Sequence, residues 1–378
     1  IRQDPSQKLY LVHAILSHQS FDINSTANSE VNYFLAKQIC KEAADLGCAK
    51  SMTEYGKLCM KNKKNKYGEI TADYTEALKY FSMSSQKGDP NGMFYHGNFL
   101  ENGFGKCEID LKEAAKLYQK SHEKGNLNGT AFYAYSMIDS KFNQLNETEG
   151  LKLIKFACDQ KNPVAYTTMG YLISFGMAGL EEDDKKEIDF YKKGAELGHP
   201  PAISNLGCMY RDGEGVPKDL DMALRYFELA YEEGATVAAY NIGLLYSEEE
   251  YGGPIDKEKA AKYYEIAINI CYRPAISKYC WLLLKDSENS KENIPKLKNL
   301  LKFGTKLNDI DTMRLRAALY LDGGNVYKRN QKLGVQILKE CVELGSKESA
   351  ETLADIYGKG SEEISADERE AKKYRDIA

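Results

Sequence analysis

A helix–turn–helix pattern that recurs along the chain constrains this sequence more than any other feature. The clearest copy runs from Gly198 to Gly234. Its terminal position recurs with steps of 36 to 41 residues, at Gly47, Gly88, Gly125, Lys161, Gly198, Gly234, Cys271, Asn308 and Gly345. A fixed period of this length is typical of stacked helical repeats, in which each unit buries its apolar face only against its neighbours.

The helices of the clearest copy are marked by apolar residues at helical spacing. In the first helix, Ala202, Leu206 and Tyr210 surround Gly207, and in the second helix Ala223 follows sixteen residues after Gly207. Small residues at these two places let the helices approach closely. The position of Gly207 is small in all nine copies: Gly56, Gly97, Ala134, Gly170, Gly207, Gly243, Cys280, Ala317 and Ala354. We therefore predict an all-α chain of about ten antiparallel helix pairs, wound as a right-handed superhelix, with no β structure.

The stretch from Leu206 to Phe227, L-G-C-M-Y-R-D-G-E-G-V-P-K-D-L-D-M-A-L-R-Y-F, resembles the Sel1-like repeat (SLR), a relative of the tetratricopeptide repeat. The tetratricopeptide unit steps by 34 residues, whereas a longer step with a D-G-x-G-V turn favours the SLR family. The resemblance covers roughly residues 31–378. We predict a single solenoid over residues 1–378, in which 1–30 form a degenerate first helix and loop, and we expect a fragment of a longer protein.

The resemblance implies a non-catalytic adaptor that assembles other proteins in signalling or complex assembly. The formal charge of −5 and the pI near 5.8 argue against nucleic acid as the partner, because phosphates require a basic surface. No stretch approaches the eighteen consecutive apolar residues of a membrane span. A protein or peptide partner remains.

The sequence carries no motif that predicts catalysis, a cofactor or a metal site. The nine cysteines form no C-x-x-C pair, and the five histidines share no metal-ligand spacing. Two S-x-x-K matches, Ser84 to Lys87 and Ser121 to Lys124, leave a repeat-based hydrolase as an alternative of another class. The partner motifs S-D-N and K-T-G are absent, so we predict that the chain is not an enzyme.

Two patterns point to different compartments. An odd, scattered set of cysteines favours reduced thiols and the cytoplasm. By contrast, Asn24, Asn128 and Asn146 each begin an N-x-S/T sequon, as a lumenal glycoprotein would have. The alternative is therefore a substrate-recruitment adaptor of an endoplasmic-reticulum ubiquitin-ligase complex, a role that the family resemblance also implies.

The candidate binding surface follows from the repeat geometry. In repeats of this kind the first helices line the concave side, so the residue after the small position and the residue three before it should face a groove. In the middle of the chain these positions are apolar or aromatic: Phe94, Tyr135, Tyr171, Tyr240, Leu244 and Trp281. Such a groove suits peptide binding. Alternatively, these side chains pack between neighbouring pairs, in which case Tyr171, Tyr240 and Trp281 would be fully buried.

Overall fold

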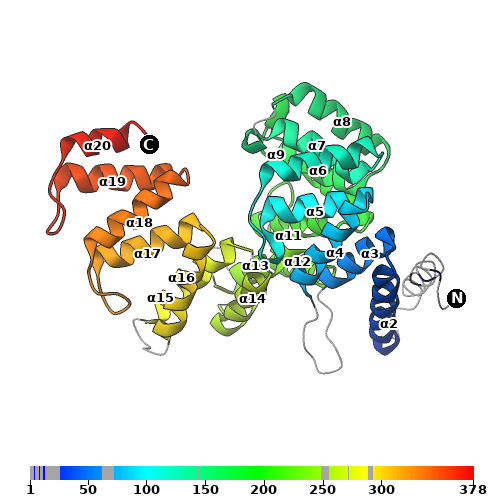
Figure 1. Ribbon diagram of the computed structural model, residues 1–378, viewed down its shortest axis with the longest axis horizontal. Coiled ribbons are helices and arrows are strands. Elements are labelled where there is room, and N and C mark those ends of the chain that lie inside the picture. The colour runs from blue at the N-terminus through cyan, green and yellow to red at the C-terminus, as the bar shows by residue number, and fades with distance from the viewer. Residues whose placement is uncertain are drawn as a thin grey trace. The chain divides into compact units, whose positions relative to one another are not determined.

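The computed structural model describes residues 4, 8, 12, 26–61, 72–142, 145–247, 255–270, 272–287 and 293–378. Within these residues the chain is helical and contains no strand, so the predicted all-α fold of antiparallel helix pairs is confirmed (Figure 1). The helices are α2 (Thr26–Asp45), α3 (Ala49–Met60), α4 (Tyr74–Gln86), α5 (Pro90–Asn102), α6 (Leu111–Glu123), α7 (Leu127–Ile138), α8 (Glu147–Asp159), α9 (Pro163–Ser174), α10 (Asp184–Glu196), α11 (Pro200–Asp212), α12 (Leu220–Glu232), α13 (Thr236–Ser247), α14 (Lys257–Asn269), α15 (Pro274–Ser287), α16 (Asn293–Lys306), α17 (Ile310–Asp322), α18 (Gln331–Glu343), α19 (Lys347–Lys359) and α20 (Glu368–Arg375).

The ends of the helices are set by capping residues. In the copy read from sequence, Gly213 adopts a left-handed conformation that ends α11, and the Asp219 side chain accepts a hydrogen bond from the Met222 amide at the start of α12. The corresponding acidic or amide cap begins the second helix of most other pairs: Asp73, Asp110, Asn146, Asp183, Asp256, Asn330 and Asp367. The second helices therefore begin at capping residues that recur with the period of the sequence repeat.

The small position in each first helix makes room for a side chain of the second helix. A Cβ atom on Gly207 would lie 2.6 Å from the ring of Phe227, and one on Gly170 would lie 2.6 Å from the ring of Tyr191. The same close approach joins Gly56 to Phe81 and Gly97 to Tyr118. The glycines thus accept an aromatic ring, and the two helices of a pair pack around it.

First helices also touch one another along the chain. In the N-terminal part α3 contacts α5, α5 contacts α7, α7 contacts α9, and α11 contacts α13. Among the described residues, consecutive second helices do not approach one another as closely. The row of first helices therefore lies on the tighter side of the stack, as the repeat geometry predicts.

The chain divides into two compact units, residues 1–253 and 254–378. The division falls in the connection between α13 and α14, and each unit has a helix-pair core of its own. A single solenoid over the whole chain stays a prediction.

At the N-terminus the helix differs from the prediction. The sequence predicts a degenerate helix and loop over residues 1–30, whereas α2 begins at Thr26 and ends at Asp45. Helix α2 packs on α3 through buried Tyr33, whose hydroxyl donates to the Leu58 carbonyl at 2.5 Å. Because the predicted first helix falls largely outside the described residues, its prediction is not tested.

One contact within the first unit joins repeats that are far apart in the chain. The buried Tyr74 hydroxyl, at the start of α4, donates a hydrogen bond of 3.0 Å to the carbonyl of Gly234, just after α12. Beside it, Lys61 Nζ lies 2.6 Å from Glu233 Oε2. The end of α12 therefore lies against the start of α4, although several repeats separate them in the chain.

Candidate partner-binding surface

Three of the six predicted surface residues are at least partly accessible. Tyr171 is 37% exposed and Trp281, in the second unit, is 50% exposed, while Tyr240 is partly buried. None of these three side chains is fully buried, and full burial is the outcome that would have contradicted the binding-surface hypothesis. Their role in binding stays a prediction.

Phe94 and Leu244 lie in the core, so their expected exposure was wrong. Phe94 is 5% exposed and packs against the rings of Tyr118 in α6 and Phe132 in α7, at centroid distances of 6.3 and 5.2 Å. The position three before the small residue thus faces the next pair. Leu244 is 4% exposed, and its neighbours Ile242 and Leu245 are buried as well. Helix α13 is therefore buried on several sides.

An aromatic cluster joins two consecutive first helices of the first unit. Tyr135 of α7 is only 9% exposed, and its ring meets Tyr171 of α9 edge to face at 5.8 Å. One turn beyond Tyr171, the Phe175 ring lies at 4.7 Å from it and is 60% exposed. We call Tyr135, Tyr171 and Phe175 the aromatic platform. Sequence reasoning missed Phe175, although its spacing of four residues from Tyr171 on one helix face would have found it.

One end of the platform is held in place by charged groups. The Tyr135 hydroxyl donates to Asp139 Oδ2 at 2.5 Å, and Lys141 Nζ lies 3.3 Å from the same carboxylate oxygen and 3.0 Å from Glu101 Oε1. Lys141 also lies 5.1 Å from the centroid of the Tyr135 ring. Burial opposes the charged form of Lys141, but Glu101 and Asp139 together raise its pKa. The two carboxylates therefore keep Lys141 charged and hold it in ion pairs.

The other end of the platform meets an acidic turn. Glu182 Cγ lies 3.5 Å from the Cβ position of Gly176, the residue that follows Phe175. Gly215, in the turn after α11, lies against the start of α10: its Cβ position is 2.7 Å from the carbonyl oxygen of Asp184. We call the exposed carboxylates of Glu182, Asp184, Asp212 and Glu214 the acidic rim.

The acidic rim is crowded with like charge. Burial and then the carboxylates of Asp212 and Asp184 raise the pKa of Glu214, and Arg211 lowers it. Arg211, however, donates two hydrogen bonds to Asp212, at 2.8 and 2.6 Å. An additional cation would therefore stabilise the carboxylates of the acidic rim.

The two serines of the S-x-x-K matches are structural. Ser84 and Ser121 have no exposed surface; the Ser84 hydroxyl donates to the Ala49 carbonyl and the Ser121 hydroxyl to the Pro90 carbonyl, both at 2.7 Å. Each joins the second helix of a pair to the start of the first helix of the same pair. A substrate could not reach either oxygen, so the hydrolase alternative loses its candidate nucleophiles.

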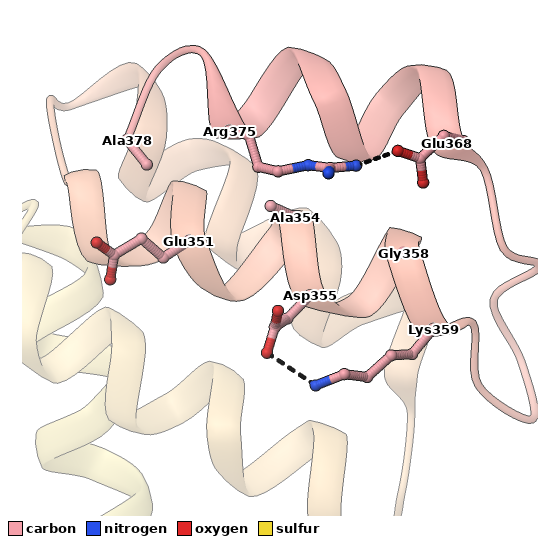
Figure 2. A pocket seen from close by; sticks show the side chains of 8 residues that line it. All are labelled: Glu351, Ala354, Asp355, Gly358, Lys359, Glu368, Arg375 and Ala378. Carbon is pink, nitrogen blue, oxygen red and sulfur yellow. Dashed lines mark hydrogen bonds and ion pairs between the residues drawn. The ribbon is translucent and has the colours of Figure 1, made fainter.

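A polar cavity lies in the second unit, between α19 and α20. Figure 2 shows its lining, in which Asp355 pairs with Lys359 at 3.1 Å and Arg375 pairs with Glu368. The cavity measures about 370 Å³ and is bordered by Glu351 and Asp355, which occupy the two repeat positions expected to face the concave side. Because its charged groups are exposed and pair within their own helices, it has the character of a solvated recess.

The described part of the chain contains no cluster of histidine, cysteine or carboxylate side chains suited to a metal ion. Among the described helices, none is long and apolar enough to cross a membrane.

The helix pairs and their exposed first-helix surface define a helical-repeat protein of the interaction type. More specifically, the chain matches the Sel1 repeat over residues 49–89, 90–126, 163–199, 200–234, 236–269 and 348–374, more than half of its length. The chain belongs to the Sel1 repeat family. Its membership points to a scaffold for protein interactions.

Solved structures with the same fold agree. A protective antigen of uropathogenic Escherichia coli strains with an SLR fold aligns over 98% of this chain and 76% of its own, with a TM-score of 0.52 at 18% identity. A Sel1 repeat protein from Oxalobacter formigenes aligns over 65% of this chain and 98% of its own, with a TM-score of 0.53 at 22% identity. These likenesses show the fold.

A curated relative shares part of the sequence. The ERAD-associated E3 ubiquitin-protein ligase component HRD3B of Arabidopsis thaliana is 32% identical over 101 residues, which is 26% of this chain. The match spans only 16% of the length of that relative.

Proposed function

We propose that this chain is a non-catalytic adaptor that binds a segment of a partner protein on its first helices, around Tyr171. The observation that carries the proposal is the pair of touching, exposed rings of Tyr171 in α9 and Phe175 at the C-cap of that helix. Exposed aromatic side chains that are already held in place supply contact area at a low entropic cost, which is why they dominate protein interfaces. In the second unit, Trp281 offers a separate exposed ring.

The test is a comparison of the proteins that co-purify with the chain from its native cells. The test variant is Tyr171→Ser/Phe175→Ser, and the matched control is Leu145→Ser/Phe156→Ser, which removes two apolar side chains that are 64% and 51% exposed. We expect a partner that is retained by the native chain and the control but lost by the test variant. Direct binding of the purified partner, with the same ranking, completes the assignment.

Equal retention by all three chains would refute the proposal. Circular dichroism and thermal melting of each variant show whether it remains folded. Since both changes remove exposed side chains, melting temperatures close to that of the native chain are expected.

A second candidate is a lumenal recruitment adaptor of a ubiquitin-ligase complex. The similarity to HRD3B, named as an ERAD-associated ligase component, favours it. It differs from the first candidate in compartment, with the endoplasmic-reticulum lumen in place of the cytoplasm, and not in the way the surface would bind.

N-linked glycosylation separates the two compartments. Asn146 is exposed and caps α8 through its Oδ1, which accepts from the Glu149 amide, so its Nδ2 can carry a glycan. By contrast, Asn128 is only partly exposed, and Thr130 of the same sequon is buried and donates its hydroxyl to the Asn126 carbonyl at 3.0 Å. Asn24 lies outside the described residues.

For a lumenal protein, endoglycosidase treatment of the native chain should therefore shift its electrophoretic mobility, Asn146→Gln should reduce that shift, and Asn24→Gln/Asn146→Gln should abolish it. A native chain with no glycan would support the cytoplasmic candidate.

A further inference from the structure

The aromatic platform and the acidic rim meet at the end of α9, and this juxtaposition restricts the chemistry of a partner. Phe175 is followed directly by Gly176, against which Glu182 lies. On the inner side of the same turn, the carboxyl of Glu187 is buried. The exposed ring of Phe175 and the exposed carboxylate of Glu182 thus lie on either side of Gly176.

Three of the cations close to this surface are already engaged. Lys141 pairs with Glu101 and Asp139, Arg211 pairs with Asp212, and Lys186 pairs with Asp183 at 2.9 Å. Across the turn, the carboxylates of Asp212 and Asp184 raise the pKa of Glu214, and Arg211 lowers it. A positively charged ligand would relieve this repulsion, whereas an anionic one would add to it.

The apolar part is preorganised. Tyr135 is buried and fixed by Asp139, Tyr171 packs edge to face on Tyr135, and Phe175 packs on Tyr171. The rings therefore lose little conformational freedom when an apolar side chain is laid on them. A ligand with charge alone would leave this surface uncovered.

We propose that the platform and the rim together bind a partner segment in which a bulky apolar side chain stands next to lysine or arginine. The apolar side chain packs on Tyr171 and Phe175, and the cation lies against the acidic rim, which includes Glu182 and Glu214. Nucleic acids and anionic lipid surfaces are disfavoured by the rim. This inference rests on the proposed function, to which it adds the chemistry of the partner.

The test measures the binding of short fluorescein-labelled peptides to the whole chain by fluorescence anisotropy. One peptide combines leucine and phenylalanine with lysine, a second replaces each lysine by glutamate, and a third replaces each apolar residue by serine. We expect the first peptide to bind at least about tenfold more tightly than the other two, and its affinity to fall as salt is raised.

Variants then assign the two parts. Phe175→Ser should weaken the apolar, basic peptide about tenfold, and Glu182→Lys/Glu214→Lys should do the same while improving the glutamate peptide. The matched control is Glu196→Lys, an exposed charge reversal on α10 away from the turn, which should leave binding unchanged.

The outcomes separate this inference from the proposed function. If the glutamate peptide binds best and Phe175→Ser abolishes its binding, the platform binds a partner but the basic chemistry is wrong. If the serine peptide binds as tightly as the first, the platform is not needed and the inference fails. Absence of binding by all peptides also overturns the inference, and the co-purification experiment then decides on the proposed function by itself.

Discussion

The ring of Phe227 fills the place where Gly207 has no side chain: its Cε1 and Cδ1 atoms lie 2.6 and 2.7 Å from the Cβ position of that glycine. Even a methyl group there must displace the ring or the helix. We therefore expect Gly207→Ala to destabilise the first unit by about 1–3 kcal/mol, although alanine is the better helix former. Chemical denaturation measures the difference.

Two further variants show whether crowding is the cause. Gly358 lies in α19 with only Ala371 Cβ near its Cβ position, at 4.0 Å, so Gly358→Ala should be neutral or stabilising by up to about 1 kcal/mol. The double variant Gly207→Ala/Phe227→Leu should lose less stability than the sum of the losses in the two single variants, Gly207→Ala and Phe227→Leu. Strict additivity would mean that the two positions do not share one space.

The hydrogen bond from Tyr74 to Gly234 gives a second prediction. Tyr74→Phe leaves a buried carbonyl without its partner and should cost about 1–2 kcal/mol. Because the bond joins distant repeats, amide hydrogen exchange should accelerate in α12 as well as in α4. The control is Tyr80→Phe, which breaks a 2.7 Å bond to Asp45 in the adjacent α2 and should affect only the neighbouring helices. Unchanged exchange in α12 would contradict this account.

His199 makes the stability of the first unit depend on pH. It stands at the N-cap of α11 without capping a backbone amide, its Nδ1 lies 2.6 Å from Thr167 Oγ1, and burial lowers its pKa from 6.5 to about 4. The folded state therefore binds this proton less readily than the unfolded state. The contribution of neutral His199 is complete above pH 6.5 and is lost as the pH falls towards 4.

Replacement by asparagine, the cap residue of α7 and α9, isolates this effect. Between pH 7.5 and pH 5 the native chain should lose about 2 kcal/mol more stability than His199→Asn, as measured by denaturant titration at the two pH values. At pH 7.5 the new cap should be neutral or stabilising by about 1 kcal/mol. Parallel pH dependence of the two chains would exclude His199 as the source.

Buried thiols should react slowly. Burial raises the pKa of Cys40, Cys158 and Cys280 to about 12, and that of Cys59 and Cys208 to about 11. Since the thiolate is the nucleophile, iodoacetamide at pH 8 should modify these five only after unfolding. Mass spectrometry of native and denatured samples reads the modification at each site, and rapid labelling of Cys40 in the native chain would contradict its placement.

The fold could be predicted because the information that determines it is local and repeated. Gly207 and Ala223 belong to one helix pair, as do the glycine Gly213 that ends α11 and the residue Asp219 that caps α12. In two copies alanine replaces glycine where the second helix has an aliphatic side chain: Ala134 with Ile154, and Ala317 with Leu338. The two residues of each pair belong to one buried cluster.

The surface was less predictable because exposure depends on the next pair and not on the residue itself. Phe94 and Tyr171 occupy first-helix positions that looked equivalent in kind, yet Phe94 is covered by the rings of the following pair. Phe175 lies beyond the repeat positions that were compared, at the junction between α9 and its turn. Similarly, Glu187 departs from the small residue of its position, and only the structure shows it buried beside Tyr191 and Ser174.

The contact between Tyr74 and Gly234 also limits how this part of the protein can change in evolution. Open repeat arrays can gain or lose a unit, because each unit touches only its neighbours. Here the backbone of Gly234 fits against the Met60 carbonyl, 3.0 Å from its Cβ position, and Tyr74 reaches it only if the intervening number of repeats is correct. A duplication or deletion of one repeat between these residues would separate the two, so the copy number of this segment is fixed by geometry.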